Sequence, residues 1–206
     1  MGAYRFELIR EAHSKLTDES DTILWMLAAA CLNEFEDIFL LAGNGRGAGA
    51  TKLLRAFYER TVTFSYLAQN PNKISQFIDY SDVHWHKLLT EAERIHTDFK
   101  VPDEDRARIK SNFERVQQQY RKEICKHCKT TEPQGSWTKR PILDMASQIN
   151  DTLRSLAFNA YLRPTFYIHT THFGILDQSE KSPEGKVSVT SVDRQREMAR
   201  NGGKSP

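Results

Sequence analysis

The sequence has few cysteines and no long hydrophobic run. Its longest apolar stretch, residues 23–32, has about half of the roughly 20 residues that a helix needs to cross a bilayer. Residues 1–13 mix charges with apolar side chains, so they lack the apolar core of a signal peptide. Three cysteines leave an odd thiol and offer no disulfide framework, which favours a reducing compartment. We therefore expect a cytoplasmic protein without a membrane partner.

Strand-like alternation of useful length is also missing before residue 176, whereas apolar residues recur at three- and four-residue spacing. This periodicity predicts an all-α fold, a single helical bundle of about six to seven helices. The expected helices cover residues 4–16, residues from Asp18 or Ser20 to 43, and residues 51–69, 72–96, 103–124, 142–149 and 150–173.

The distribution of apolar residues predicts the domain organisation. Residues 1–175 are expected to form one helical domain, and residues 176–206 a disordered polar tail, because the tail has almost no large apolar side chain to bury. Residues 23–32 are apolar nearly all round the helix, so we expect that helix to be the most buried. Gly174 is expected to end the last helix.

Three short motifs resemble cofactor or metal sites but lack required parts. The glycine-rich residues 45–50 precede Thr-Lys, the reverse of the Lys-Ser/Thr order of a Walker loop, and follow a predicted helix. Residues 125–128, Cys-Lys-His-Cys, have no second cysteine pair for a zinc site. Residues 93–96, Glu-Arg-Ile-His, have no second copy for a di-iron site. We expect neither a cofactor nor a metal.

Positive charge is concentrated between Arg106 and Arg140. This segment holds ten Lys or Arg against three Glu, an excess of seven. One interpretation is a solvated helix face followed by a loop. The other is a surface that faces phosphates, which predicts RNA as a partner of residues 106–140.

The last predicted helix carries a polar stripe among apolar neighbours. Tyr161, Thr165, His169 and His172 are spaced four, four and three residues apart, so they share one face of a straight helix. Polar side chains inside a bundle need partners or a cavity. The stripe is therefore either a hydrogen-bonded network that fixes helix register or part of a functional site.

Arg55 and Glu59 form an i, i+4 pair on a helix otherwise rich in apolar residues. On the surface such a pair contributes a few tenths of a kcal/mol at most. Facing the polar stripe, the guanidinium and carboxylate would lie beside two imidazoles. That set can bind phosphate and move protons near neutral pH. The sequence leaves these two placements open.

Three segments of the chain, residues 43–71, 136–150 and 161–174, resemble consecutive signature blocks of a widespread bacterial all-helical family of undetermined function. The resemblance spans roughly residues 40–174. It implies a helical bundle and brings no settled activity. The signature positions are Arg55, Glu59, Trp137, Tyr161, Thr165 and His169.

A second, weaker resemblance concerns HEPN domains, helical bundles of toxin–antitoxin and phage-defence systems. Many of them cut RNA without metal, as dimers, through an Arg-x(4–6)-His motif, and the segment from Arg163 to His169 has that spacing. Pro164 stands where the family usually has Asn, Asp or His. On a straight helix Arg163 and His169 would lie about 120° apart, so convergence needs a kink at Pro164 or a partner chain.

The resemblance to HEPN domains implies a metal-independent endoribonuclease that acts as a homodimer. His169 would be the base or acid with His172 as its partner, and Arg163 or Arg55 would hold the phosphate. Tyr161 and Thr165 would orient the imidazole. Two alternatives are a non-catalytic interaction module, such as the regulatory partner in a defence system, and a bundle enzyme that binds a nucleotide or small phosphate. The candidate catalytic residues are His169, Arg163, His172, Arg55, Glu59, Tyr161 and Thr165.

Overall fold

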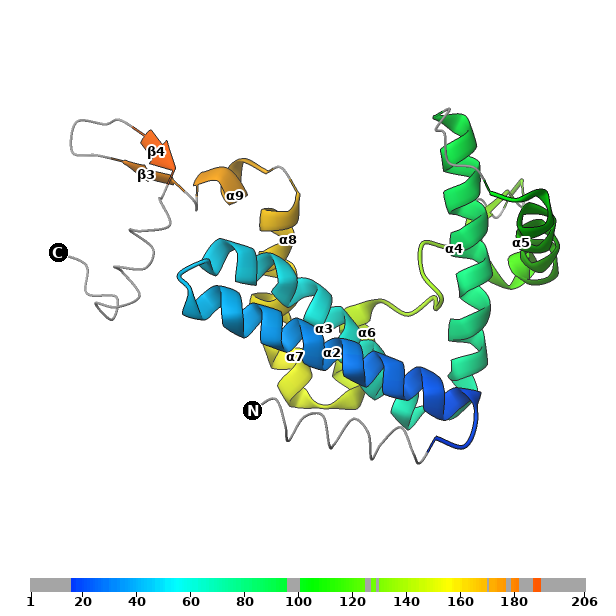
Figure 1. The fold of residues 1–206 in the computed structure, drawn as a ribbon, viewed down its shortest axis with the longest axis horizontal. Coiled ribbons are helices and arrows are strands. Elements are labelled where there is room, and N and C mark those ends of the chain that lie inside the picture. The colour runs from blue at the N-terminus through cyan, green and yellow to red at the C-terminus, as the bar shows by residue number, and fades with distance from the viewer. Residues whose placement is uncertain are drawn as a thin grey trace. The chain divides into compact units, whose positions relative to one another are not determined.

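The computed structural model describes residues 16–95, 101–124, 127–128, 130–169, 171–176, 179–181 and 187–189. These residues form an all-helical fold with two small hairpins, which confirms the predicted fold class (Figure 1). Within them, no helix combines the length and apolarity that crossing a bilayer requires.

The chain divides into two compact units. Unit 1 comprises Met1–Gln69 and Ile142–Pro206, and unit 2 comprises Asn70–Pro141. The expectation that residues 1–175 act as one domain stays a prediction.

Two long helices, α2 (Glu19–Gly43) and α3 (Gly47–Gln69), lie side by side in unit 1 (Figure 1). The Asp18 side chain caps α2 by accepting the N–H of Asp21 at 2.8 Å. At the other end Gly45 has a φ of 72°, and the N–H of Arg46 donates to the carbonyl of Leu41 at 2.8 Å. This is a Schellman turn, which uses glycine for its left-handed residue. The glycine-rich segment thus forms this Schellman turn and then the first helical turn of α3.

The most buried helix of unit 1 is α3, so the prediction for residues 23–32 is wrong. No residue of α2 is buried, although its segment is apolar nearly all round. Position explains the difference, because α3 contacts α2 and also α6 (Ile142–Ile149), the π-helical turn η3 (Phe158–Leu162) and α8 (Arg163–Ile168). The buried residues of α3 are Ala50, Tyr58, Val62, Thr63, Tyr66 and Leu67.

The predicted helix over residues 150–173 is divided into several pieces. Asn150 caps α7 (Asp151–Ala157) by accepting the N–H of Leu153 at 2.8 Å. The turn η3 follows, and in it the N–H of Arg163 donates to the carbonyl of Phe158, five residues back. Pro164 explains this wider turn, because it has no N–H and its ring would clash with the carbonyl four residues earlier in a regular helix.

The end of the last predicted helix also differs from the prediction. His169 has extended backbone (φ −88°, ψ 145°) and ends α8. Gly174 lies inside the short helix α9 (His172–Leu176) and is not a C-terminal stop. A Cβ at Gly174 would lie 2.1 Å from the carbonyl oxygen of Phe166, so glycine permits the close approach of α9 to α8.

Two short strands, β3 (Ser179–Lys181) and β4 (Val187–Val189), pair in antiparallel fashion within the predicted tail. The other residues of the tail beyond Leu176 lie outside the described residues, as do residues 4–15 of the helix expected over residues 4–16.

Unit 2 is built on α4 (Ile74–Arg94), preceded by the 3-10 turn η1 (Pro71–Lys73), and on α5 (Asp103–Val116). The helix predicted over residues 103–124 ends early. After α5 the chain forms the 3-10 turn η2 (Gln117–Tyr120) and then strand β1 (Arg121–Glu123), which pairs with β2 (Thr131–Pro133).

Uncharged polar bonds join the elements of unit 2. The hydroxyl of Tyr80 donates to the carbonyl of Gln134, and the hydroxyl of Tyr120 donates to the carbonyl of Gln76, both at 2.7 Å. The two tyrosine rings meet edge to face at 5.0 Å between centroids. Burial, together with the Asp79 carboxylate, raises the pKa of Tyr120 to about 12, so its hydroxyl stays a donor over most of the pH range.

Candidate functional site

Arg55 lies on the face of α3 that meets α8. Its Nε donates to Oε1 of Glu59 at 3.0 Å, and its Nη1 donates to Oγ1 of Thr165 at 2.9 Å. The first contact follows from the i, i+4 spacing on one helix. The second joins residues 110 positions apart. Of the two placements that the sequence left open, the structure therefore has Arg55 facing Thr165 of the polar stripe. The stripe is not one continuous helix face, because α8 ends at Ile168, His169 has extended backbone and His172 begins α9.

An aromatic ring lies under the guanidinium. The Cζ atom of Arg55 is 4.8 Å from the centroid of the Tyr161 ring, which is within the range of a cation–π contact. The Tyr161 ring lies 5.9 Å from that of Tyr58, whose hydroxyl donates to the carbonyl of Leu153 at 2.8 Å. Burial raises the pKa of Tyr58. The Tyr161 ring thus packs against the guanidinium, and the Tyr58 ring packs against that of Tyr161.

The guanidinium of Arg55 keeps capacity for a further partner. Its bonds to Glu59 and Thr165 use two of the five N–H donors of an arginine, which leaves three among the contacts of the described residues. The Arg55 side chain is 23% exposed and that of Glu59 is 42% exposed. The cation is therefore held in one orientation while part of it reaches the surface.

Thr165 connects this cluster to His169. Its hydroxyl accepts from Arg55 and donates to the carbonyl of Tyr161 at 2.8 Å. Its own carbonyl accepts the backbone N–H of His169 at 3.1 Å. His169 is exposed and lies one helical turn, about 5.4 Å along the axis, beyond Thr165. His169 is thus exposed and bonded through its backbone to the residue that Arg55 contacts.

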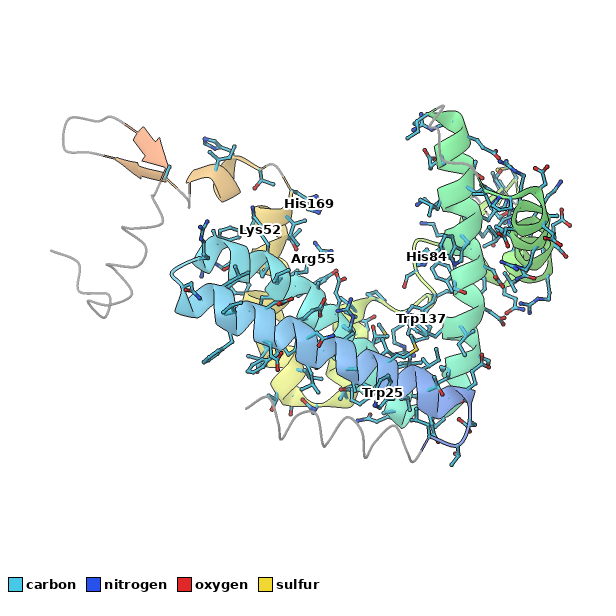
Figure 2. The ribbon with its side chains drawn as sticks, viewed as in Figure 1. Trp25, Lys52, Arg55, His84, Trp137 and His169 are labelled. Atoms are coloured by element: carbon cyan, nitrogen blue, oxygen red, sulfur yellow. The ribbon has the colours of Figure 1, made fainter. Side chains whose placement is uncertain are left out.

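A shallow pocket of about 240 Å³ lies beside His169. Lys52 reaches it from α3, where it precedes Arg55 by three residues and shares the same face of the helix. Figure 2 shows Lys52, Arg55 and His169 near the end of α8. Among the described residues of the lining, Lys52 carries a positive charge and none is a carboxylate. These residues are Lys52, Phe166, Tyr167, Ile168, His169, Thr171, Gly174 and Ile175.

The other candidates have different positions. Arg163 and His172 are the first residues of α8 and α9, and both are exposed. Arg55 is bonded to the turn that precedes His169. Trp137 is buried in unit 2, where its ring meets Phe77 edge to face at 5.4 Å. Its surroundings are those of a packing residue.

Sequence reasoning missed Lys52 and Tyr58. Lys52 directly follows the glycine-rich motif in sequence. The signal that could have identified it is its three-residue spacing from Arg55, which places both cations on one helix face. The sequence around Tyr58 gives no signal that it belongs to the site. Its role follows from its ring contact with Tyr161 in the structure.

The basic segment between Arg106 and Arg140 is largely a surface of ion pairs. Several of its partners precede the segment in sequence, so the excess of seven charges overstates the local field. Lys122 and Glu132 are opposite each other in the β1–β2 hairpin. The pairs of this segment are Arg106–Glu93, Arg108–Asp105, Arg115–Asp79, Arg115–Asp82 and Lys122–Glu132.

Comparison with known proteins places the chain in a family but assigns no activity. No curated protein and no solved structure matches the chain. One family model, described as a family of unknown function, matches residues 21–186. This range contains Arg55, Thr165 and His169, and it fits the helical family of undetermined function that the signature blocks resemble. The chain belongs to this family, DUF5677.

Proposed function

We propose that the surface formed by Lys52, Arg55 and His169 binds a phosphate group of RNA, and that His169 takes part in metal-independent cleavage of the RNA strand. One observation carries the proposal. The bond between Arg55 and Thr165 joins a part-exposed guanidinium to the helical turn that ends at the exposed His169.

The charges around the pocket favour an anion of this kind. A guanidinium offers paired N–H donors that match the oxygens of a phosphate, and an ammonium adds a compact positive charge. Glu59 offsets part of the charge of Arg55, but Lys52 and His169 line the pocket without a carboxylate among the lining residues that the structure describes. A pocket of about 240 Å³ suits one phosphate group and its ester oxygens better than a whole nucleotide.

RNA supplies its own nucleophile, so the protein needs a base, an acid and positive charge. The base removes the proton of the 2′-hydroxyl, whose oxygen attacks the phosphorus. The bond from phosphorus to the 5′-oxygen breaks, and the acid protonates that oxygen. A 2′,3′-cyclic phosphate and a 5′-hydroxyl result. His169 serves as one of these groups and His172 as the other, while Arg55 and Lys52 stabilise the developing negative charge.

The remaining cations of the basic segment provide contacts to the RNA backbone. Lys110, Lys139 and Arg140 are exposed, and the structure assigns them no carboxylate partner among the described residues. Such contacts are independent of sequence and weaken with salt. As for HEPN domains, we expect the active form to be a homodimer.

The direct test is cleavage of a single-stranded RNA in the presence of EDTA. Wild-type protein should release 2′,3′-cyclic phosphate ends, and the variant His169→Ala should not. Removing one acid or base costs roughly 100- to 10,000-fold in rate. His84→Ala is the matched control, because His84 is an exposed histidine of unit 2 outside residues 106–140 and should leave the rate unchanged. Full cleavage by His169→Ala would exclude the mechanism.

A second candidate is a protein that binds phosphate without cleaving RNA. It is favoured by the contacts of Arg55, whose guanidinium is held by Glu59, Thr165 and the Tyr161 ring as in a structural network. On this view wild-type protein binds RNA but does not cut it, and His169→Ala and Tyr161→Phe lower the melting temperature without a catalytic effect. Binding and melting measurements on the same variants separate the two functions.

A further inference from the structure

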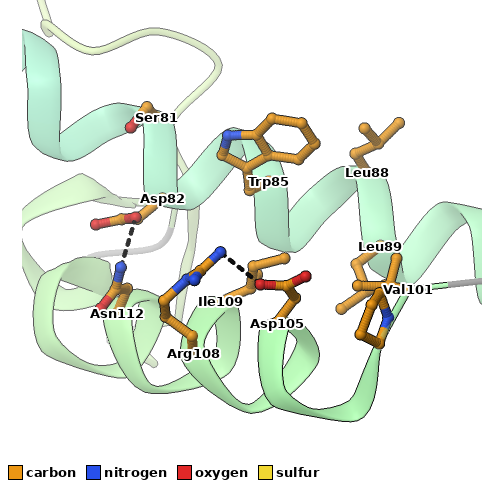
Figure 3. A pocket seen from close by; sticks show the side chains of 11 residues that line it. Ser81, Asp82, Trp85, Leu88, Leu89, Val101, Asp105, Arg108, Ile109 and Asn112 are labelled. Atoms are coloured by element: carbon orange, nitrogen blue, oxygen red, sulfur yellow. Dashed lines mark hydrogen bonds and ion pairs between the residues drawn. The ribbon is translucent and has the colours of Figure 1, made fainter.

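A larger pocket lies between α4 and α5 inside unit 2 (Figure 3). Its volume is about 500 Å³, within the range of roughly 300–1,000 Å³ that is usual for small-molecule sites. It is separate from the residues of the proposed phosphate site, all of which belong to unit 1. None of its lining residues has a role in the proposed cleavage.

One part of the lining is apolar and includes an exposed indole. Trp85 is 53% exposed and Leu88 is 51% exposed, although both are large hydrophobic residues on α4. An indole at a pocket offers a flat face on which another ring can stack. The other apolar lining residues are Leu89, Val101, Pro102 and Ile109.

The charged part of the lining holds two carboxylates and one guanidinium among the described residues. Asp82 accepts from Asn112 at 3.1 Å and from Arg115 at 3.2 Å, and Arg115 is shared with Asp79. Asp105 accepts from Arg108 at 2.6 Å. The described lining therefore disfavours an anionic ligand.

Hydrogen-bonding capacity nevertheless remains at the pocket. Arg108 has further N–H donors beyond its contact with Asp105, and its side chain is 71% exposed. The amide of Asn112 has a carbonyl oxygen besides the donor that it offers Asp82. Figure 3 shows Trp85 on α4 and these polar side chains on α5 as opposite walls of the pocket. A fitting ligand therefore has a flat apolar face and an edge with both donors and acceptors.

We propose that this pocket binds a nucleobase. A nucleobase is flat and neutral, it stacks on aromatic side chains, and its edge carries donors and acceptors together. In the pocket the ring stacks on Trp85 while its edge meets Arg108 and Asn112. The base belongs either to a free nucleoside or to a single-stranded RNA. The proposal goes beyond the proposed function, because binding of a free nucleoside requires no cleavage.

The test is calorimetric titration of the full chain with four probes. Adenosine and a single-stranded oligoadenylate of about ten nucleotides carry the base. Ribose 5-phosphate lacks the base, and benzylammonium is a flat cation. Adenosine should bind, whereas ribose 5-phosphate and benzylammonium should not. If the natural ligand is a free nucleoside, adenosine should bind at least as tightly as the oligonucleotide does per site. If it is a single-stranded RNA, the oligonucleotide should bind more tightly than adenosine.

Variants connect binding to the indole. Trp85→Ala should weaken adenosine binding roughly 5- to 150-fold, the effect of losing one base–aromatic stack, and Trp85→Phe should keep most of the affinity. Phe39→Ala is the matched control, because Phe39 is an aromatic residue of α2 with 69% exposure. Absence of adenosine binding, equal binding by Trp85→Ala, or a preference for benzylammonium overturns the proposal. Each result is independent of RNA cleavage by His169.

Discussion

Both units join distant elements through tyrosine hydroxyls, and they differ in where their arginines lie. In unit 1 the Tyr58 hydroxyl donates to the carbonyl of Leu153, and the partly buried Arg55 guanidinium also bonds to Thr165 across 110 residues of sequence. In unit 2 the corresponding bonds come from neutral hydroxyls, those of Tyr80 and Tyr120, to backbone carbonyls. The arginines of unit 2 make their ion pairs at the surface, and the side chain of Arg115 is 58% exposed.

This difference bears on what Arg55 is for. The tyrosine hydroxyls of both units show that neutral groups can join packed elements. Placing a cation in a partly buried position carries a desolvation cost that neutral donors avoid. We infer that the charge of Arg55 serves more than the joining of α3 to α8, which supports a role in binding an anion.

The largest expected effect is alkaline destabilisation through unit 2. The pKa of Tyr120 is raised to about 12 in the folded chain, against an ordinary value of 10. Between these values the unfolded chain loses the hydroxyl proton while the folded chain retains it, so stability falls as pH rises from 10 to 12. A difference of two pKa units corresponds to about 2.7 kcal/mol. Urea unfolding at several pH values measures this loss.

The variant Tyr120→Phe isolates the contribution of that hydroxyl. It should be less stable at pH 8 by about 1 kcal/mol, because it lacks the bond to Gln76. Its stability should then fall less steeply than that of wild type above pH 10. Parallel pH curves for the two proteins would show that Tyr120 does not carry the effect.

The next effect compares the two kinds of arginine directly. Arg55→Ala should lower the free energy of unfolding by about 2 kcal/mol, because it removes two hydrogen bonds of a charged, partly buried group. Arg115→Ala should lower it by less than about 1 kcal/mol, since an exposed ion pair contributes little. Urea unfolding at pH 7 gives both numbers, and equal losses would remove the distinction between the units.

The sequence predicts much of unit 1 because its signals are local. The i, i+4 spacing of Arg55 and Glu59 gives their ion pair, and the four-residue spacing of Tyr161 and Thr165 gives the bond from the Thr165 hydroxyl to the Tyr161 carbonyl. The turn η3 was harder to foresee. Proline excludes a regular helix, but whether the chain kinks, ends or widens depends on the packing of its neighbours.

Two further errors have a common cause, which is that contacts between distant segments decide them. Helix α2 is more apolar than α3, yet α3 is more buried because other helices cover it. The positive excess of residues 106–140 is likewise reduced by carboxylates from earlier in the chain, such as Asp79 and Glu93. The composition of a segment indicates which environments suit it, whereas the tertiary fold determines which other segments it contacts.

A smaller effect tests the connection between Arg55 and α8. Thr165→Val removes the hydroxyl that accepts from Arg55 but keeps a side chain of similar shape. The free energy of unfolding should fall by about 1 kcal/mol, the net value of one hydrogen bond. Thr165→Ser retains the hydroxyl and should lie closer to wild type in the same thermal or urea measurement. If the serine variant is the less stable of the two, the methyl group matters more than the bond.

The smallest expected effect distinguishes a cation that contacts RNA from one that is already paired. Lys52 lines the proposed phosphate site, whereas Arg106 of unit 2 is paired with Glu93. Each phosphate contact on a single strand adds about 0.7 to the slope of log affinity against log salt concentration. Lys52→Ala should therefore reduce that slope by about 0.7, and Arg106→Ala should leave it unchanged. Fluorescence anisotropy of a labelled RNA at several salt concentrations gives the slopes. A larger change for Arg106→Ala than for Lys52→Ala would move the RNA contact to unit 2, because counterion release reports only those cations that meet the phosphates.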